Sequence, residues 1–287
     1  MSSATGTEEF IDVTTAANYI PEKWSPEIIE AREENFLFEG LVDIRYENGL
    51  SSGDTIHVPH KSHLDARSKS ANTAITYETV TESKTDISID QHYYAAFAIE
   101  EIVDAQSFMN QKALYAPGLG YALSEEVDTQ IAALVQAFTQ TVGSLGTGTS
   151  VDNWIRAEQY LLDANAPMTE ISAVCSPAEW ANLIKQDYFV KSNYTDAVGK
   201  ISPKAQGAFF GNALNMNFYR STNIEGDNTN GHDNGVFHKS AMALVRQIAP
   251  TTRAAYDVDY LCHKVVSHEL FGIAEMRDDH GVWVKGK

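Results

Sequence analysis

The stretch TDISIDQHYYAAFAIEEIVDAQ, residues 85–106, decides the fold. Its odd positions between 87 and 99 are apolar except for Gln91: Ile87, Ile89, Tyr93, Ala95, Phe97 and Ile99. Alternation with a period of two predicts a β-strand with one buried face. A continuous strand of this length would extend about 43 Å, at roughly 3.3 Å per residue, far beyond the usual strand. We therefore expect it to lie on another surface, in the same subunit or in a neighbour.

The segment before this stretch predicts the other half of a long β excursion. After Gly53, Ile56 and Val58 alternate with polar neighbours, which indicates a strand, and Pro59 ends the pairing or marks a sheet edge. The polar sequence HKSHLDARSKSAN follows at residues 60–72, and alternation resumes with Ile75, Tyr77 and Thr79. Two strands joined by a polar tip are expected, and an isolated ribbon of this kind is marginal in water.

After the stretch, apolar residues recur at helical spacing, in the series Leu123, Val127, Ile131, Leu134, Val135 and Phe138. This stripe predicts a long amphipathic helix. Pro117 and Gly118 are expected to separate it from a shorter helix over Ile102–Leu114. The glycine-rich sequence GSLGTGTS, residues 143–150, then predicts a flexible link at a domain boundary.

A second α/β unit is predicted after the link. It begins with a helix whose buried side carries Trp154, Ala157 and Leu161. A buried strand at Ile171–Cys175 follows, and Ser-Pro-Ala-Glu at 176–179 has the residues of a helix N-terminus. Strands are expected near 213–221 and 242–248, with GDNTNGHDNG at 226–235 as a mobile loop between them. The C-terminal segment, including Tyr256, Val258 and Tyr260, predicts strands that complete a sheet begun earlier.

Composition and charge narrow the function. Among 287 residues, 43% are hydrophobic, and 21 Lys and Arg face 39 Asp and Glu, a formal net charge of −18. Such a charge repels phosphate, so tight nucleic-acid binding is not expected. No apolar run is long enough for a membrane span, and the polar, acidic start is unlike a signal peptide, so cytoplasmic synthesis is expected. Cys175 and Cys262 lack CxxC spacing and are expected to be reduced and buried.

Three histidines, His57, His60 and His63, are the strongest candidates for a chemical site, because imidazoles that gather together bind zinc or copper. Their spacing would point the rings to opposite faces of a strand, and Pro59 excludes a helix here. We find no nucleophile elbow, phosphate loop or zinc-protease motif elsewhere in the sequence. The sequence therefore predicts no catalytic, cofactor-binding or metal residues, and a protein that is not an enzyme.

Several stretches resemble, in the same order, those of tailed-bacteriophage major capsid proteins, whose fold was first described for phage Hong Kong 97. They are AANYIPEKWSPEIIEAREENFLFEGLV (16–42), GDTIHVPH (53–60), the stretch at 85–106, and RAEQYLLDANAPMTEISAVCSPAEWANLIK (156–185). The resemblance extends from about residue 15 to 285 and lies in the collinear set, since no single fragment is a signature.

This resemblance implies an α+β capsid fold with an N-terminal arm at residues 1–50 and an extended β loop at 51–92. A peripheral domain with a long spine helix would comprise 93–149 and 249–287, and an axial α/β domain 150–248. The implied function is structural: pentamers and hexamers form the icosahedral shell of the virion, which encloses double-stranded DNA without sequence-specific binding. A separate scaffolding protein and a portal are implied as partners, the family allows a decoration protein, and no cofactor or membrane is involved. Synthesis would take place in the cytoplasm of the host bacterium.

Two other interpretations stay open at this point. One is a metal-dependent enzyme that uses His57, His60 and His63. The other is a monomeric binding module whose β excursion adds to the sheet of a partner. Large assemblies of the purified protein would favour the shell, stoichiometric bound metal the enzyme, and a compact monomer the binding module.

Overall fold

The computed structural model describes residues 36–47, 53–61, 64–77, 79–80, 82–106, 111–190, 201 and 207–287. They belong to a unit that runs from Glu34 to Lys287, and a further unit comprises Met1–Glu33. Most of the predicted arm at 1–50 therefore lies outside the described residues. Its described end departs from the prediction, because the short helix α1, Phe38–Leu41, buries Phe38 in the core. A 3-10 turn, η2 at Arg45–Glu47, follows it.

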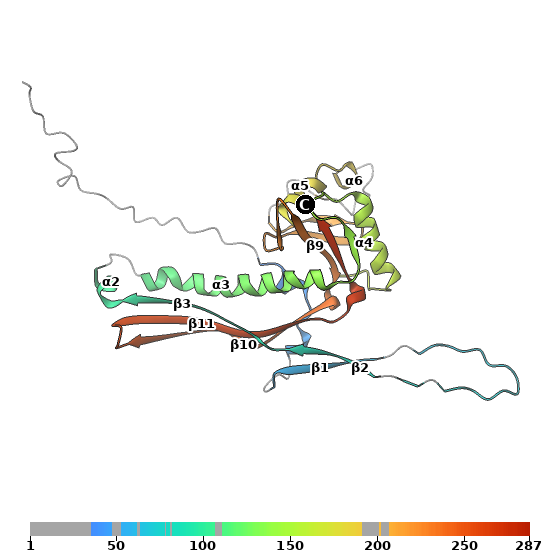
Figure 1. Cartoon of the computed structure of the whole chain (residues 1–287), viewed down its shortest axis with the longest axis horizontal. Coiled ribbons are helices and arrows are strands. Elements are labelled where there is room, and N and C mark those ends of the chain that lie inside the picture. Colours follow the sequence, from blue (N-terminus) through green and yellow to red (C-terminus); the bar gives the residue numbers. More distant parts are fainter. Residues whose placement is uncertain are drawn as a thin grey trace, which may run out of the picture. The chain divides into compact units, whose positions relative to one another are not determined.

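The described strands form three sheets (Figure 1). A two-stranded antiparallel ribbon pairs β1, Thr55–His60, with β2, Ser83–Ser88. A three-stranded antiparallel sheet has the order β10–β11–β3, with bounds Met242–Asp257, Cys262–Glu275 and Gln91–Glu100. A seven-stranded mixed sheet has the order β4–β12–β9–β5–β7–β6, with β8 also paired to β9. Its strands are β4 (Thr141–Gly143), β5 (Ile171–Cys175), β6 (Phe209–Ala213), β7 (Met216–Arg220), β8 (Gly226–Asp227), β9 (Gly231–His238) and β12 (Gly281–Gly286).

The predicted strand from 87 to 99 is divided in two. β2 ends at Ser88 and β3 begins at Gln91, and they belong to different sheets. The alternation itself is confirmed, since Ile87 and Ile99 are buried while every second residue of β3 is exposed. A single unbroken strand was wrong because the two halves have different partners, β1 and β11.

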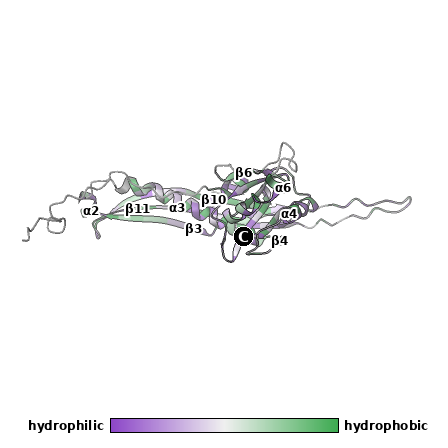
Figure 2. Ribbon diagram, turned by 90° about the horizontal axis from the view of Figure 1, so that it is seen from above, coloured by the Kyte–Doolittle hydropathy of each residue, from purple (hydrophilic) through white to green (hydrophobic). Residues whose placement is uncertain are grey.

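One helix, α3, runs from Gln111 to Ala133 along β3 and β11 (Figure 1), and a 3-10 turn, η3 at Leu134–Ala137, extends it. Hydrophobic and hydrophilic colours alternate along α3 in Figure 2. The predicted stripe is confirmed by five buried side chains: Leu123, Val127, Ile131, Val135 and Phe138.

The predicted break at Pro117 is wrong. Pro117 lies inside α3, in its second turn, where it removes one backbone hydrogen bond and its ring crowds the carbonyl group four residues earlier, but the helix continues through it. The preceding helix, α2 at Glu101–Gln106, is separated from α3 by residues 107–110, which lie outside the described ranges. No helix in the described part of the chain is long and apolar enough to cross a membrane.

The seven-stranded sheet carries its own core. α4, Val151–Asp163, buries the predicted side of Trp154, Ala157 and Leu161, and every residue of β5 is buried. α5, Pro177–Leu183, begins as predicted, because Ser176 Oγ accepts a hydrogen bond from the N–H of Glu179 at 3.0 Å. α6, Asp187–Val190, follows it.

The glycine-rich segment at 143–150 is ordered, so the prediction of a flexible link is wrong. Thr149 is buried and donates its N–H and its hydroxyl to Glu179 Oε1, at 3.1 and 2.5 Å. Glu179 is fully buried and also accepts hydrogen bonds from the side chain of Asn182 and the N–H of Lys287. A buried carboxylate with several charge-assisted hydrogen bonds fixes what it contacts, here the segment before α4, α5 and the end of the chain after β12.

The segment at 226–235 is a hairpin formed by β8 and β9, and the prediction of a mobile loop is wrong. Asp227 Oδ1 accepts hydrogen bonds from the N–H groups of Thr229 and Asn230, at 2.6 and 2.7 Å, which close the turn. Asn234 is fully buried, and its Oδ1 accepts from the N–H of Ser176 at 2.7 Å. The Asn- and Gly-rich composition therefore serves a tight turn and a buried polar contact.

The C-terminal strands are divided between two sheets. β11 pairs with β3 as expected, from Cys262 opposite Glu100 to Phe271 opposite Gln91. β12 instead pairs with β9 and β4, because a turn at Asp278–His280 redirects the chain and Val282 and Val284 enter the core of the seven-stranded sheet. Cys175 and Cys262 are free and buried, as predicted.

The first prediction concerns the buried face of α3. Ile131→Ala removes a side chain that is 1% exposed and should lower the free energy of unfolding by about 2–5 kcal/mol. Glu125→Ala, on the exposed side of the same helix, is the matched control and should change it by less than about 0.5 kcal/mol. Chemical denaturation measures both, and equal small effects would show that the helix is not packed.

Candidate functional site

The base of the β1–β2 ribbon is packed against the three-stranded sheet. Ile87 of β2 is fully buried in a cluster that includes Val245 of β10. β2 also contacts β11, and a Cβ atom at Gly272 would collide with the carbonyl oxygen of Ser88. Glycine is needed at this position because the two backbones approach so closely. The ribbon is thereby held at one end by the same strands that pack against α3.

The loop beyond the ribbon, residues 61–82, contains neither helix nor strand among its described residues. The polar tip is confirmed by exposed residues throughout 64–73, but four large apolar side chains are exposed as well. Their exposed fractions are 55% for Leu64, 56% for Ile75, 85% for Tyr77 and 57% for Val80. The described residues of the predicted strand, 75–77 and 79, are not in a strand, and no strand of the described chain pairs with them.

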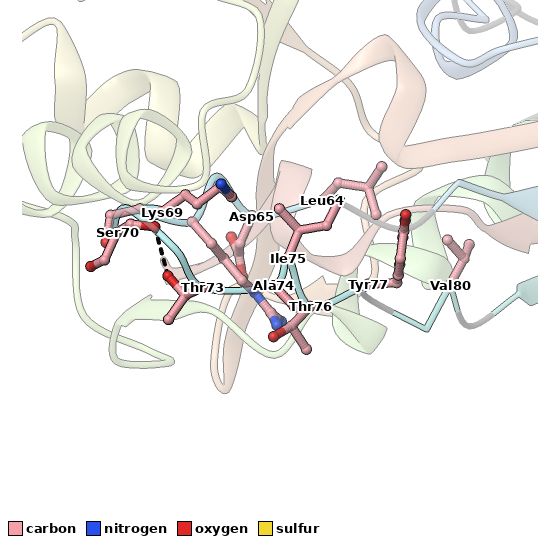
Figure 3. Close-up of a pocket in the computed structure, with 12 residues that line it drawn as sticks. Leu64, Asp65, Lys69, Ser70, Thr73, Ala74, Ile75, Thr76, Tyr77 and Val80 are labelled. Carbon is pink, nitrogen blue, oxygen red and sulfur yellow. Dashed lines mark hydrogen bonds between the residues drawn. The ribbon is translucent and has the colours of Figure 1, made fainter.

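A hollow of about 580 Å³ is lined by residues of this loop. Figure 3 draws these residues as sticks. The loop alone supplies the lining, with Leu64, Ile75, Tyr77 and Val80 among the side chains drawn. The Thr73 hydroxyl donates a hydrogen bond to the carbonyl oxygen of Ser70 at 2.6 Å, drawn as the dashed line. Exposed apolar side chains on a long loop are typical of a surface that another chain covers.

The candidate histidines do not converge. His57 Nδ1 lies 2.5 Å from Asp86 Oδ1, and His60 Nε2 lies 2.6 Å from Thr85 Oγ1, in the same strand pair. His57 and His60 are three apart on β1, so their side chains leave opposite faces. His63 lies outside the described residues. Within the described ranges, no three His, Cys, Asp or Glu side chains gather as metal ligands.

A second exposed apolar surface lies at the turn between β10 and β11. Val258, Tyr260 and Leu261 are each more than half exposed. The N–H of Glu101 donates to the carbonyl oxygen of Leu261 at 3.0 Å, so α2 begins beside this turn and adds the exposed Ile102. The predicted strand through these positions ends at Asp257, because the backbone reverses there. Sequence reasoning missed this surface, since the alternation of apolar residues was equally typical of a buried strand.

Glu275, the last residue of β11, carries a strongly shifted carboxyl group. Burial and the neighbouring carboxylate of Asp278 raise the pKa of Glu275 to about 7. Asp278 Oδ1 accepts the N–H of Thr139 at 2.7 Å and is held beside Glu275. Near neutral pH a proton on Glu275 therefore bridges two carboxyl groups at the point where the chain leaves one sheet for the other.

No family model and no curated protein matches this chain. Solved phage structures do match its fold. A chain from Mycobacterium phage Che8 is 22% identical, with a TM-score of 0.79, over 93% of this chain and 97% of that one. A chain from the capsid structure of the cyanophage P-SCSP1u is 15% identical, with a TM-score of 0.77 and 93% of each chain covered. A chain from the asymmetric unit of the mature capsid of bacteriophage PhiM1 is 14% identical, with a TM-score of 0.74, over 99% of this chain and 96% of that one.

The chain therefore has the mixed helix and sheet fold of these phage structures, two of which are described as capsids, as the resemblance predicts. It matches them over nearly its whole length and theirs, so the likeness concerns the complete fold and not one motif. Nothing in the matched structures supports the metal-dependent enzyme or the monomeric binding module. A shared fold does not by itself assign a function, which has to be argued from the residues of this chain.

The second prediction follows from Glu275. Its pKa is about 7 in the folded chain against an ordinary value of 4.5, so the folded state binds more protons in this window and stability falls as pH rises through it. Glu275→Gln stays neutral and keeps a donor for Asp278. After allowing for solvent screening, the free energy of unfolding of this variant should exceed that of the parent by about 1 kcal/mol at pH 8 and by little at pH 5.

Denaturation at both pH values measures the effect. Asp278→Asn, which removes the partner charge but keeps an acceptor for Thr139, should flatten the same pH dependence. If Glu275→Gln stabilises the chain equally at pH 5 and pH 8, the raised pKa of Glu275 is contradicted.

Proposed function

We propose that the chain is the major capsid protein of a tailed bacteriophage, the subunit that builds an icosahedral shell around double-stranded DNA. The observation that carries this proposal is the loop at 64–80, which exposes four large apolar side chains that the described chain does not cover. Together with a fold shared with phage capsid structures, this supports copies of the chain as the partner that covers the loop. No catalytic role is proposed.

A loop that lies on a different surface of the next copy makes a head-to-tail contact, and such contacts close into rings when the rotation allows. Rings of five and six copies, pentamers and hexamers, are the units of an icosahedral shell. The exposed turn at 258–261 supplies a second apolar surface on each subunit. Two separate apolar surfaces are what a subunit needs in order to contact neighbours both within a ring and between rings.

The charge of the chain fits enclosure of DNA rather than binding to it. A subunit with a formal charge of −18 has nothing to gain from counterion release on a phosphate backbone. The shell would therefore hold the genome as a closed wall. We therefore propose the virion as the location of the protein, after synthesis in the cytoplasm of the host bacterium.

The domain division is also part of the proposal. Residues 1–50 form the arm, 51–92 the extended loop, 93–149 and 249–287 the peripheral domain, and 150–248 the axial domain. The grouping of α3 with β3 and β11, and of α4 with the seven-stranded sheet, supports two such parts. The pairing of β12 with β9 argues for moving the last strand to the axial part. A separate scaffolding protein and a portal are the proposed partners, and a decoration protein is compatible with this arrangement.

The third prediction tests the intersubunit role of the loop. Ile75→Ser with Tyr77→Ser removes two exposed apolar side chains and should leave the thermal unfolding of the free subunit unchanged. Shell formation, followed by light scattering and electron microscopy, should fall strongly. Leu162→Ser removes an exposed apolar side chain from α4 and is the control, which should assemble normally. Shells formed by the double variant as efficiently as by the parent would show that the loop is not a contact.

The fourth prediction concerns salt. Subunits of charge −18 repel one another, and ions at 0.15 M already shorten the range of this repulsion to about 8 Å. More salt should therefore favour shells over free subunits until specific ion pairs weaken. Free subunits should show no sub-micromolar binding to duplex DNA at about 50 mM salt. Tight DNA binding that fades steeply with salt would overturn the enclosure argument.

A further inference from the structure

A hollow of about 690 Å³ opens between the end of β1, the turn η2 and the segment that leads from β11 to β12. Its volume is in the range of small-ligand sites. Five separate parts of the chain supply the walls, the other two being the connection between α4 and β5 and the end of β9 with the turn after it, through His238 and Ser240. Part of the lining is apolar, with Tyr46, Val58, Pro59 and Met276.

The polar part of this lining is cationic. Its charged side chains are Arg45, Lys61 and Arg277, and none of its residues is Asp or Glu. Three histidines, His60, His238 and His280, also line the hollow. A lining without Asp or Glu is unusual in a chain where 39 acidic residues outnumber 21 Lys and Arg. Asp43 engages Nε and Nη2 of Arg45 from outside the lining. For Lys61 and Arg277, no ion pair with another described residue is present.

Two of the histidines are held in place through Ser240. The N–H of Ser240 donates to His238 Nδ1 at 3.1 Å, so this nitrogen is an acceptor and the ring proton is on Nε2. Ser240 Oγ lies 2.8 Å from His238 Nδ1 and 2.9 Å from His280 Nδ1. The hydroxyl therefore donates to His238 and accepts from His280 Nδ1–H, which leaves His280 Nε2 as the nitrogen with a lone pair.

The charges around these rings favour an added anion. Burial lowers the pKa of His238 and of His280, and the positive charge of Arg277 lowers both pKa values as well. Glu170 acts in the opposite direction on the pKa of His238, and Asp279 does so on that of His280, but neither carboxylate lines the hollow. Cations gathered without a counter-charge among the lining residues repel one another, and an oxyanion between them would relieve the repulsion.

The backbone at the end of α4 does not supply that counter-charge. Helix C-termini carry partial negative charge on their last carbonyl groups. Here the carbonyl oxygen of Leu161 accepts from the N–H of Ala166 at 2.9 Å, and that of Leu162 accepts from the N–H of Asn165 at 3.0 Å. These oxygens are already hydrogen-bonded, so they do not take the place of an anion in the hollow.

We propose that this hollow binds an oxyanion, a phosphate or a carboxylate group, through the charges of Lys61 and Arg277 with the imidazole of His60 beside them. The guanidinium is suited to two oxygens of one group, and the ammonium adds a point charge. Free phosphate and a carboxylate side chain of a second copy share this chemistry. Only the second source rests on the proposed shell function.

The test is to titrate inorganic phosphate into the free full-length chain, with chloride at matched ionic strength as the reference. Calorimetry and the NMR signals of the histidine rings report binding. Lys61→Gln with Arg277→Gln should weaken the affinity by roughly tenfold for each cation removed. Lys185→Gln with Arg156→Gln removes the same charge at two exposed positions and should leave the affinity unchanged. Lys61→Arg should retain binding.

Absence of saturable phosphate binding, or an equal loss in the control pair, would overturn the proposal. Assembled particles then identify the natural source. Phosphate that binds particles as well as it binds free chains indicates an anion from solution. Loss of phosphate binding on assembly, with poor assembly of the Lys61→Gln and Arg277→Gln pair, indicates a carboxylate of a second copy. Phosphate binding is measured on free chains and does not require particles. Failure of the anion site can therefore be distinguished from failure of the proposed shell function.

Discussion

Association of this chain depends on apolar side chains that one copy leaves uncovered. Leu64, Ile75, Tyr77 and Val80 lie on a loop that the described chain does not pack against. Full burial of a large apolar side chain is worth roughly 1.5–3 kcal/mol, whereas fixing one loop residue costs about 1–2 kcal/mol. A single contact of this kind is therefore weak. Stable association needs many of them at once, which a closed shell of identical subunits provides.

The anchoring of the β1–β2 ribbon explains how such a loop is placed on the subunit. Its base packs against β10 and β11, where Gly272 allows the backbone of Ser88 to approach. β10 changes register between Arg246 and Ile248 and again before Thr251, and there it passes from a buried half to an exposed half. Arg246 lies at the first of these shifts. Its Nη1 donates a hydrogen bond to Glu39 Oε1 of α1, and its Nε lies 3.8 Å from Oε2 of the buried Glu269. The β1–β2 ribbon, α1 and the three-stranded sheet thus meet near the register shifts of β10.

Much of this fold follows from local patterns in the sequence. The stripe from Leu123 to Phe138, the alternation along β3 and the Ser176 cap were predictable, because each depends on residues within one element. The errors arose where distant residues decide the outcome. Glu179 orders a glycine-rich segment that looks flexible on its own. Likewise, Asn234 ties an Asn- and Gly-rich hairpin to the start of α5.

The candidate site was predictable only in part. A polar loop tip and the need for an outside surface followed from the pattern at 53–99, whereas the exposed turn at 258–261 and the cationic hollow did not. The hollow brings together five segments, most of them far apart in the sequence, and only the three-dimensional structure shows their convergence. His57 and His60 illustrate the converse, since residues close in sequence are kept apart by strand geometry.

Sedimentation of the purified chain over a concentration and salt series, with the solvent accessibility of Tyr77 followed by oxidative footprinting, tests the central claim most directly. We expect rings or closed particles at high concentration, in which Tyr77 becomes protected while the exposed Leu162 of α4 remains accessible and serves as an internal reference. A chain that stays monomeric throughout, or particles in which Tyr77 is as reactive as in the free subunit, would contradict this claim.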